Sequence, residues 1–176
     1  MDDLQRTLVF LIHSVKQFLF GFEKLIEAAD ECEDGSAAKA FYMTSFYNYV
    51  SVFYLLDKKA GDLHGGTIYK ALHPHGLDGH LTPITNILTR PIGSTTFGEI
   101  VRTVRNKMIV HTTYSDSDLD RIYSAADMAH PTIAQSFHEC LWDLYHETRL
   151  LPVRLIEDMG LSPADFGITI APEDTR

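Results

Sequence analysis

Arg105 and His111, in the stretch VRTVRNKMIVH, are separated by five residues and have side chains suited to phosphodiester chemistry. The guanidinium group of arginine is planar and permanently charged, so it can clamp two phosphate oxygens at once. A histidine imidazole has an unperturbed pKa of about 6.5, so it can accept and donate a proton near neutral pH. The two side chains together could therefore bind and cleave a phosphodiester.

Three polar neighbours extend this constellation. Asn106 can orient the histidine or hydrogen-bond a ribose or phosphate oxygen, while Arg102 and Lys107 add positive potential in a chain that is acidic elsewhere. The simpler alternative is a helix with a solvated basic side that ends in a capping histidine, because His and Lys are favourable near a helix C-terminus. Residue types and spacing alone leave both interpretations open.

A second group of histidines and acids lies in and before the stretch LHPHGLDGH. Imidazole and carboxylate groups at short spacing can bind zinc or another transition metal. The candidate ligands are Asp62, His64, His73, His75, Asp78 and His80. We favour a surface loop without metal, because no long helix or strand is predicted to fix the ligand directions. The single helix histidines are interpreted as surface or satisfied core residues: His13, His138 and His146.

Periodicity predicts the elements that position these residues, beginning with a long N-terminal helix. Its apolar residues recur at alternating steps of four and three, which places them on one stripe. The stripe comprises Leu4, Leu8, Leu11, Val15, Phe18, Phe22 and Leu25. We expect this helix to end near ECEDGS, where Gly35 can take the left-handed conformation.

A second helix over 37–59 has two apolar stripes rich in aromatics, typical of a helix buried on two sides. Alternatively, some of its tyrosines could stack on bases or line a subunit interface.

The segment 61–95 is rich in glycine, proline and histidine and reads as a long insertion. A structureless loop of this length would be unusual inside a compact domain. Its short apolar pieces, TIYKAL and ITNIL, are therefore predicted to form single helical turns that pin the insertion to the bundle.

The stretch around Arg105 belongs to a third helix predicted from about residue 96 to 110, with Thr95 or Thr96 as its cap. At 100° per residue, Arg105 and His111 flank a buried apolar stripe and are separated by about 120°. The predicted stripe comprises Phe97, Val101, Val104 and Met108. A shared site would therefore need the helix to unwind near His111, or a two-fold partner that supplies the same residues.

After a short helix expected over 119–126, the last long helix is predicted from a further apolar stripe. This stripe comprises Ala134, Phe137, Leu141, Leu144, Thr148, Leu151 and Leu155. Pro152 is expected to kink or restart the helix. Four main helical patterns without a convincing strand pair predict an all-α fold: an antiparallel bundle over residues 1–160, with short extra helices in the insertion and a loose tail over 161–176.

Composition fits one globular domain of 176 residues. A formal net charge of −9 argues against broad binding to nucleic acid, so any such site must be local. Cys32 and Cys140 are 108 residues apart, without the spacing of a zinc pair, and are interpreted as reduced, buried thiols. We find neither a secretion signal nor a membrane span, and we expect a cytoplasmic protein.

The heptapeptide RNKMIVH resembles the signature of the HEPN superfamily. In that superfamily an arginine, usually followed by a polar residue, precedes a histidine by four to six intervening positions near the end of the third main helix of an α-bundle. Arg105, Asn106 and His111 match these positions, and the expected place on the third helix matches as well.

The resemblance implies a homodimer that places two Arg–His pairs in one cleft and cleaves RNA through its 2′-hydroxyl without a metal or other cofactor. Many members are toxins or abortive-infection proteins against phage, often paired with an antitoxin protein. We therefore expect an endoribonuclease with Arg105, Asn106 and His111 as catalytic residues and with Arg102 and Lys107 binding the substrate.

Two alternatives remain open at this stage. Other HEPN-like proteins lack activity, so the chain could be a non-catalytic helical dimer that binds nucleotide or another protein. A weaker third reading is a metal enzyme that uses the histidines of the 62–80 loop. The long insertion and the acidity of the chain both depart from the simplest members of the superfamily.

Overall fold

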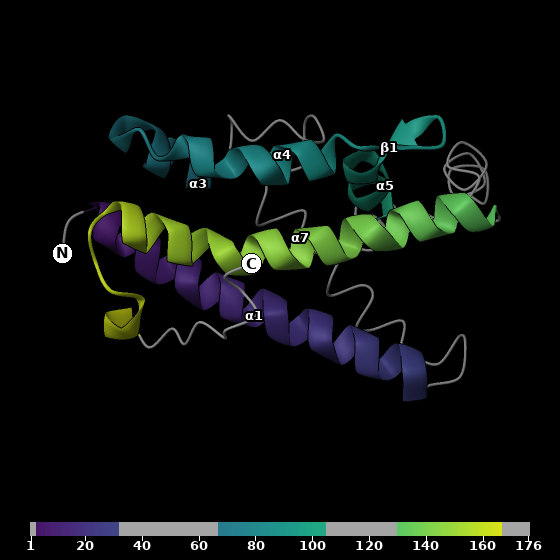
Figure 1. Cartoon of the computed structure of the whole chain (residues 1–176), viewed down its shortest axis with the longest axis horizontal. Coiled ribbons are helices and arrows are strands. Elements are labelled where there is room, and N and C mark those ends of the chain that lie inside the picture. The colour runs from purple at the N-terminus through teal and green to yellow at the C-terminus, as the bar shows by residue number, and fades with distance from the viewer. Residues whose placement is uncertain (1–2, 32–66, 105–129, 167–176) are drawn as a thin grey trace.

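The structure is a computed structural model that describes residues 3–31, 67–104 and 130–166 (Figure 1). These residues are mostly helical, with a single two-stranded hairpin among them, which confirms the all-α class. The helices expected over 37–59 and 119–126 lie outside the described residues. Within the described ranges, no helix combines the length and the apolar character needed to span a membrane.

Helix α1 (Asp3–Glu31) is the predicted N-terminal helix, and it ends at the start of ECEDGS. Its predicted stripe faces the protein interior. The stripe residues that are buried are Leu8, Leu11, Val15, Phe18 and Phe22, and Leu4 is partly buried against them. Because this stripe follows the period of a straight helix, burial of one face accounts for the helix over its whole length.

Helix α7 (Pro131–Asp158) is the predicted last helix. Five residues of its predicted stripe are buried, namely Phe137, Leu144, Thr148, Leu151 and Leu155, whereas Ala134 is exposed and Leu141 is half-buried. The helix continues through Pro152, so the restart expected there does not occur. Pro152 is itself buried, and packing around it helps to offset the loss of its backbone hydrogen bond.

A Schellman motif ends α7. Gly160 has a positive φ of 69°, the backbone N–H of Gly160 donates to Glu157, and that of Leu161 donates to Ile156. These hydrogen bonds satisfy carbonyls that the end of the helix leaves without intrahelical partners. The chain then turns away and forms a short 3₁₀ turn, Pro163–Phe166.

The segment after residue 66 forms one wall of the core. It comprises α3 (Thr67–Leu72), 3₁₀ turns at His73–His75 and Asp78–Leu81, and α4 (Thr82–Leu88). The helices α3 and α4 coincide with TIYKAL and ITNIL, which confirms that these pieces are helical and pin the segment. Its core residues are Ile68, Leu72, Leu81, Ile84, Ile87 and Leu88. The segment expected as an insertion therefore contributes directly to the main core.

A hairpin follows α4, in which β1 (Pro91–Ile92) pairs antiparallel with β2 (Thr95–Thr96). Gly93 lies in its two-residue turn with a φ of 60°, a conformation that favours glycine. Helix α5 (Phe97–Val104) begins immediately afterwards. The backbone N–H of Glu99 donates to the side-chain oxygen of Thr96 at 3.3 Å, so Thr96 caps this helix as predicted.

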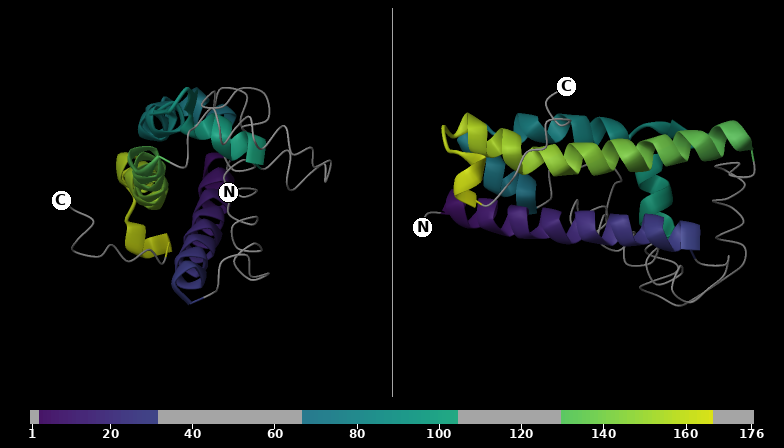
Figure 2. Two further views of the ribbon diagram at one scale, coloured as in Figure 1. Left: turned by 90° about the vertical axis from the view of Figure 1, so that its right-hand side faces the viewer. Right: turned by 60° about the horizontal axis from the view of Figure 1, so that its bottom comes forward.

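Helices α1 and α7 run antiparallel, and α3 and α4 lie along the other side of α7 (Figure 1). Figure 2 shows α1, α7 and the α3–α4 segment at the corners of a triangle, with α5 lying crosswise between α7 and α1. The predicted stripe of α5 faces inward, because Phe97 and Val101 are fully buried, and the ring of Phe97 is 5.2 Å from that of Phe137 on α7. Packing on α7 thus fixes the start of the helix that leads into Arg105.

Candidate functional site

Of the five residues assigned to the predicted site, Arg102 falls within the described residues. Its guanidinium donates a hydrogen bond to the Glu99 carboxylate at 2.7 Å, and 27% of its side chain is exposed. Its Nε is buried and has no hydrogen-bond partner in the described structure. Because Glu99 offsets part of its charge, Arg102 supplies less positive potential than the sequence suggests.

The other predicted site residues are Arg105, Asn106, Lys107 and His111, and all four lie outside the described residues. Their chain position still follows from α5, since Arg105 comes directly after Val104, the last described residue of that helix. The roles of these four residues remain predictions from the sequence.

The histidines of the LHPHGLDGH stretch face separate partners. His73 Nδ1 lies 3.1 Å from the hydroxyl of Tyr69 and 3.2 Å from a carboxylate oxygen of Asp78. His80 Nε2 lies 2.6 Å from a carboxylate oxygen of Asp158, which ties this turn to the end of α7. Among the described residues, no three His, Cys, Asp or Glu side chains converge as a metal site would require. Asp62 and His64 lie outside these residues.

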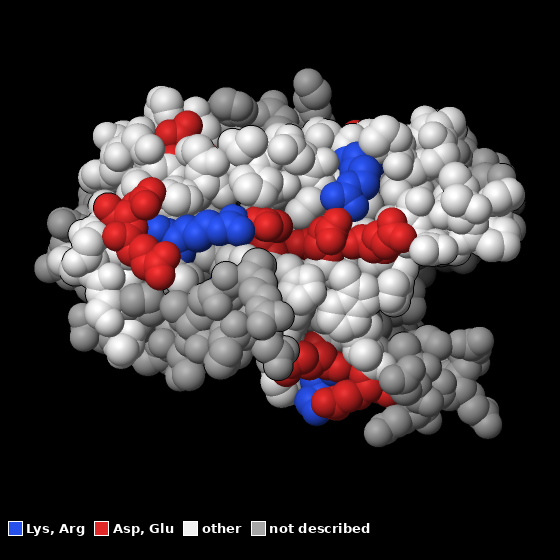
Figure 3. Space-filling view, viewed as in Figure 1, with Lys and Arg blue, Asp and Glu red and all other residues white. Residues whose placement is uncertain are grey.

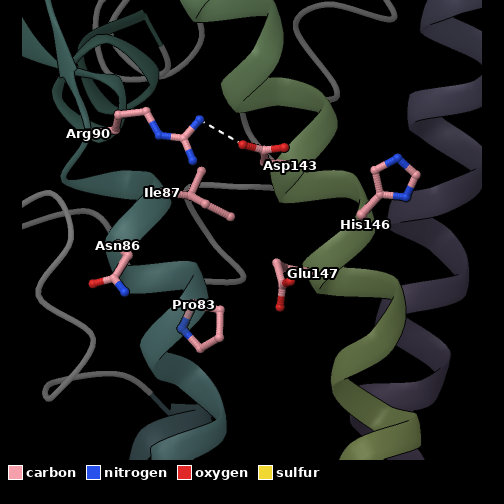
Figure 4. Close-up of a pocket in the computed structure, with 7 residues that line it drawn as sticks. All are labelled: Pro83, Asn86, Ile87, Arg90, Asp143, His146 and Glu147. Atoms are coloured by element: carbon pink, nitrogen blue, oxygen red, sulfur yellow. Dashed lines mark hydrogen bonds and ion pairs between the residues drawn. The ribbon is translucent and has the colours of Figure 1, made fainter. Parts of the chain in front are cut away.

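A pocket of about 240 Å³ opens between α4 and α7. Its lining combines polar side chains with a small apolar surface: Pro83, Asn86, Ile87, Arg90, Asp143, His146 and Glu147. Figure 4 shows that Asp143 and Glu147 come from the α7 wall, whereas Asn86 and Arg90 come from the α4 wall and the residues just after it. His146 projects from the other side of α7 in this view, so it borders the pocket at its edge.

An ion pair closes one end of this α4–α7 pocket. Arg90 Nη1 donates to a carboxylate oxygen of Asp143 at 2.7 Å, and this hydrogen bond raises the pKa of Arg90 above its ordinary value. At the other end, Arg154 donates two hydrogen bonds to Glu147, at 2.6 and 3.3 Å. Each carboxylate of the pocket is thus held and largely neutralised by an arginine.

Sequence periodicity does not reveal this pocket. The spacing of Asp143 and Glu147 places both carboxylates on one face of α7, which a reader of the sequence could have noticed. Arg90, however, is 53 residues away from Asp143 in the chain, so only the packing of α4 on α7 brings them together. His146 is exposed, as expected for a single surface histidine, and it also borders the edge of this polar pocket.

The surface of α7 is acidic beside the pocket. Figure 3 shows acidic side chains in a row along this helix, with basic groups beside and between them. Glu139, Asp143 and Glu147 recur at steps of four, which places them on one line of the helix. Because Arg90 and Arg154 pair with Asp143 and Glu147, this face has no excess of basic groups that could bind several phosphates at once.

Cys140 lies beneath the Arg90–Asp143 pair and is fully buried, as the sequence predicted for this thiol. Burial raises the pKa of the Cys140 thiol, and the positive charge of Arg90 opposes that rise in part. Near neutral pH the group is accordingly a protonated thiol of low nucleophilicity.

We predict that, in a Cys32→Ser variant, an aromatic disulfide reagent at pH 7.5 will modify folded Cys140 at least about a hundredfold more slowly than it modifies the unfolded chain. Unfolding exposes the thiol and returns its pKa toward the ordinary value, so both access and thiolate content rise. The release of the coloured thiol measures the rate, and the same variant in urea is the control. Equal rates in the folded and unfolded protein would contradict the buried position of Cys140.

Comparison with family models, with curated proteins and with solved structures found no match to this chain. Its function must therefore be argued from its own residues. The two features that bear on function are the RNKMIVH stretch that continues from α5 and the polar α4–α7 pocket.

Proposed function

We propose that this protein is a HEPN-like, metal-independent endoribonuclease of the toxin or phage-defence type. The observation that carries the proposal is the heptapeptide RNKMIVH, which directly follows the described part of α5. Two further features support it: the helical character of the chain and the capped start of α5 where the third helix was expected.

The proposed reaction uses the RNA's own 2′-hydroxyl as nucleophile. His111 acts as general base and accepts the hydroxyl proton while the 2′-oxygen forms a bond to phosphorus. The bond from phosphorus to the 5′-oxygen breaks, and a protonated imidazole, either His111 or its two-fold copy, donates a proton to the leaving oxygen. Arg105 stabilises the negative charge that develops on the phosphorane-like transition state, and Asn106 orients the histidine. The products are a 2′,3′-cyclic phosphate and a 5′-hydroxyl.

This mechanism is tested by incubating the purified full-length protein with mixed RNA in the presence of EDTA. The heptapeptide RNKMIVH contains no carboxylate, and the proposed mechanism uses no metal, so EDTA should leave cleavage unchanged. Matched DNA should survive, because it lacks the 2′-hydroxyl. The proposal fails if RNA remains intact, or if the cleaved ends lack the cyclic phosphate.

We further propose that the active form is a homodimer of antiparallel four-helix bundles, located in the cytoplasm and paired with an antitoxin protein. On an undistorted helix, Arg105 and His111 would flank a buried stripe on opposite margins, so a two-fold partner is the simplest way to form a complete site.

Light scattering at micromolar concentration is expected to give about twice the 19.9 kDa mass of the chain. A matched measurement on His111→Ala should give the same mass, because the substitution removes a reacting group rather than an apolar contact. A monomeric mass for the parent protein at these concentrations would exclude the composite site.

One observation favours a second candidate, a non-catalytic dimer that binds nucleotide or another protein. The Glu99–Arg102 ion pair reduces the positive charge available beside the motif, whereas a nuclease gains from more positive potential there. The cleavage assay distinguishes the two candidates, since only the nuclease produces cyclic phosphate ends.

A further inference from the structure

We infer that the α4–α7 pocket binds a guanine base. The base could belong to RNA, in which case the pocket selects the substrate of the proposed nuclease, or to a free guanine nucleotide. Only the RNA alternative rests on the proposed function, because the fit of the base follows from the pocket itself.

The size of the pocket suits a single ring system. Sites for drug-sized ligands enclose roughly 300–1,000 Å³, and this pocket, at about 240 Å³, is smaller. Ile87, which is buried, and Pro83, which is half-buried, make part of the lining apolar. A flat heterocycle with polar edges therefore matches the mixed lining.

The α4 wall of the pocket offers hydrogen-bond donors to one edge of the base. Arg90 donates a hydrogen bond to Asp143, and a guanidinium group carries five N–H donors in a fixed fork, so N–H donors remain for a ligand. Arginine is the most common partner of the O6 and N7 acceptors of guanine. Figure 4 shows the exposed Asn86 side chain pointing from α4 away from α7, so Arg90 is the donor that this wall offers.

The α7 wall offers acceptors to the other edge. A carboxylate can accept about four hydrogen bonds, so Asp143 and Glu147 retain acceptor capacity beyond their arginine partners. Guanine presents adjacent N–H groups at N1 and N2 that such a carboxylate can accept. Adenine has no N–H at position 1 and carries an amino group in place of O6, so it would leave both walls with unmatched groups.

The charged side chains of the pocket are paired with one another, which favours a neutral ligand. Arg90 faces Asp143, and Arg154 faces Glu147, so neither a cation nor an anion finds an uncompensated opposite charge. The nucleotide is accordingly expected to enter with its base, leaving its phosphate in solvent.

The pocket also adjoins the start of α5. The backbone carbonyl of Arg90 accepts a hydrogen bond from the N–H of Phe97 at 3.0 Å, so one wall of the pocket is tied to the first residue of α5. That helix rises about 10 Å from Phe97 to Val104, after which the chain continues into the RNKMIVH stretch. A base held in the pocket would thus lie near the helix that leads to the proposed catalytic residues.

The inference is tested by titrating GMP and, separately, AMP into the full-length protein in EDTA, with calorimetry or NMR as the readout. We expect saturable GMP binding and at least about tenfold weaker AMP binding, because AMP carries the same phosphate but the wrong edges. Absence of saturable GMP binding, or equal affinity for both nucleotides, would overturn the inference.

Single substitutions test whether GMP binds in the α4–α7 pocket. Glu147→Gln removes one negative charge within the pocket, and Glu139→Gln removes one from the same helix at an exposed position outside it. Glu147→Gln should weaken GMP binding about tenfold, and Glu139→Gln should change it less than about twofold. Asn86→Ala, at an exposed position whose side chain points away from α7, should change GMP binding less than about twofold. Equal loss in the Glu139 or Asn86 variant, or no loss in the Glu147 variant, would contradict the assignment.

The source of the base is distinguished by cleavage of matched RNAs with and without guanine. Preferential cleavage of the guanine-containing RNA, lost in Glu147→Gln, supports an RNA substrate. Selective GMP binding without this preference assigns the pocket to a free guanine nucleotide. If RNA is cut but GMP is not bound, the pocket assignment fails and the nuclease proposal stands. If GMP is bound selectively but RNA is not cut, the pocket assignment stands and the nuclease proposal fails.

Discussion

Replacing His111 with alanine is expected to abolish RNA cleavage while leaving the fold intact. In the proposed mechanism the imidazole takes the proton from the 2′-hydroxyl, and alanine has no group that can do so. The sequence places His111 at the margin of the predicted apolar stripe, near the end of its helix, where truncation removes little packing. Production of 2′,3′-cyclic phosphate ends in EDTA measures the loss.

Replacing Arg105 with alanine is expected to slow the same reaction by about a hundredfold, which corresponds to a loss of about 3 kcal/mol of transition-state stabilisation. The arginine donates hydrogen bonds to a developing charge, and removal of one such donor typically has an effect of this size. Arg102→Ala should reduce cleavage less, because Glu99 already engages that side chain.

The matched control is His13→Ala. His13 is exposed on α1, contacts Gln17 and is not one of the proposed site residues, so its loss removes an imidazole from the surface alone. This variant should cleave at the parental rate. If the His111 and Arg105 variants also cleave at that rate, the nuclease assignment of the pair is wrong and the non-catalytic module becomes the better interpretation.

The second large effect concerns stability. Phe22→Ala is expected to lower the free energy of unfolding by about 3–5 kcal/mol, because it removes a buried aromatic side chain and leaves a cavity. Only 1% of Phe22 is exposed, and its ring lies 5.1 Å from Trp142 and 4.7 Å from Tyr145. Both contacts join α1 to α7, so the loss falls on the main helix–helix interface of the described structure.

The control for this substitution is Phe20→Ala on the same helix. Phe20 is 62% exposed, so the same change in volume should alter stability by less than about 0.5 kcal/mol. Urea unfolding followed by circular dichroism gives both values, provided that the slope with denaturant is unchanged. Comparable destabilisation by the two variants would contradict the inward orientation of the α1 stripe.

The helical elements could be predicted because their signals are local. The stripe of α1 and the cap of α5 by Thr96 each depend on residues within one or a few turns of helix, where spacing alone fixes which side chains share a face. TIYKAL and ITNIL were identified as helical for the same reason. Pro152 shows the limit of local rules, because α7 continues through it, stabilised by neighbours that belong to other elements.

The proposed catalytic pair is a different case. Arg105 and His111 were identified from residue chemistry and spacing together with a resemblance, and both lie outside the described residues. Arg102 shows why spacing is insufficient: Glu99, one turn away on the same helix, lowers the charge that this arginine can offer to a substrate. A list of residue types does not show which charges are already paired.

The sequence by itself determined α1, α7, the capped start of α5 and the burial of Cys140, because each follows from composition or from periodicity over a few turns. Only the tertiary structure decided that the segment after residue 66 completes the core, that His80 meets Asp158 and that Arg90 meets Asp143 beside a pocket. Those partners are 78 and 53 residues apart in the chain. Local spacing carries no information about such pairs, because they form only when separate helices pack at one particular position and angle.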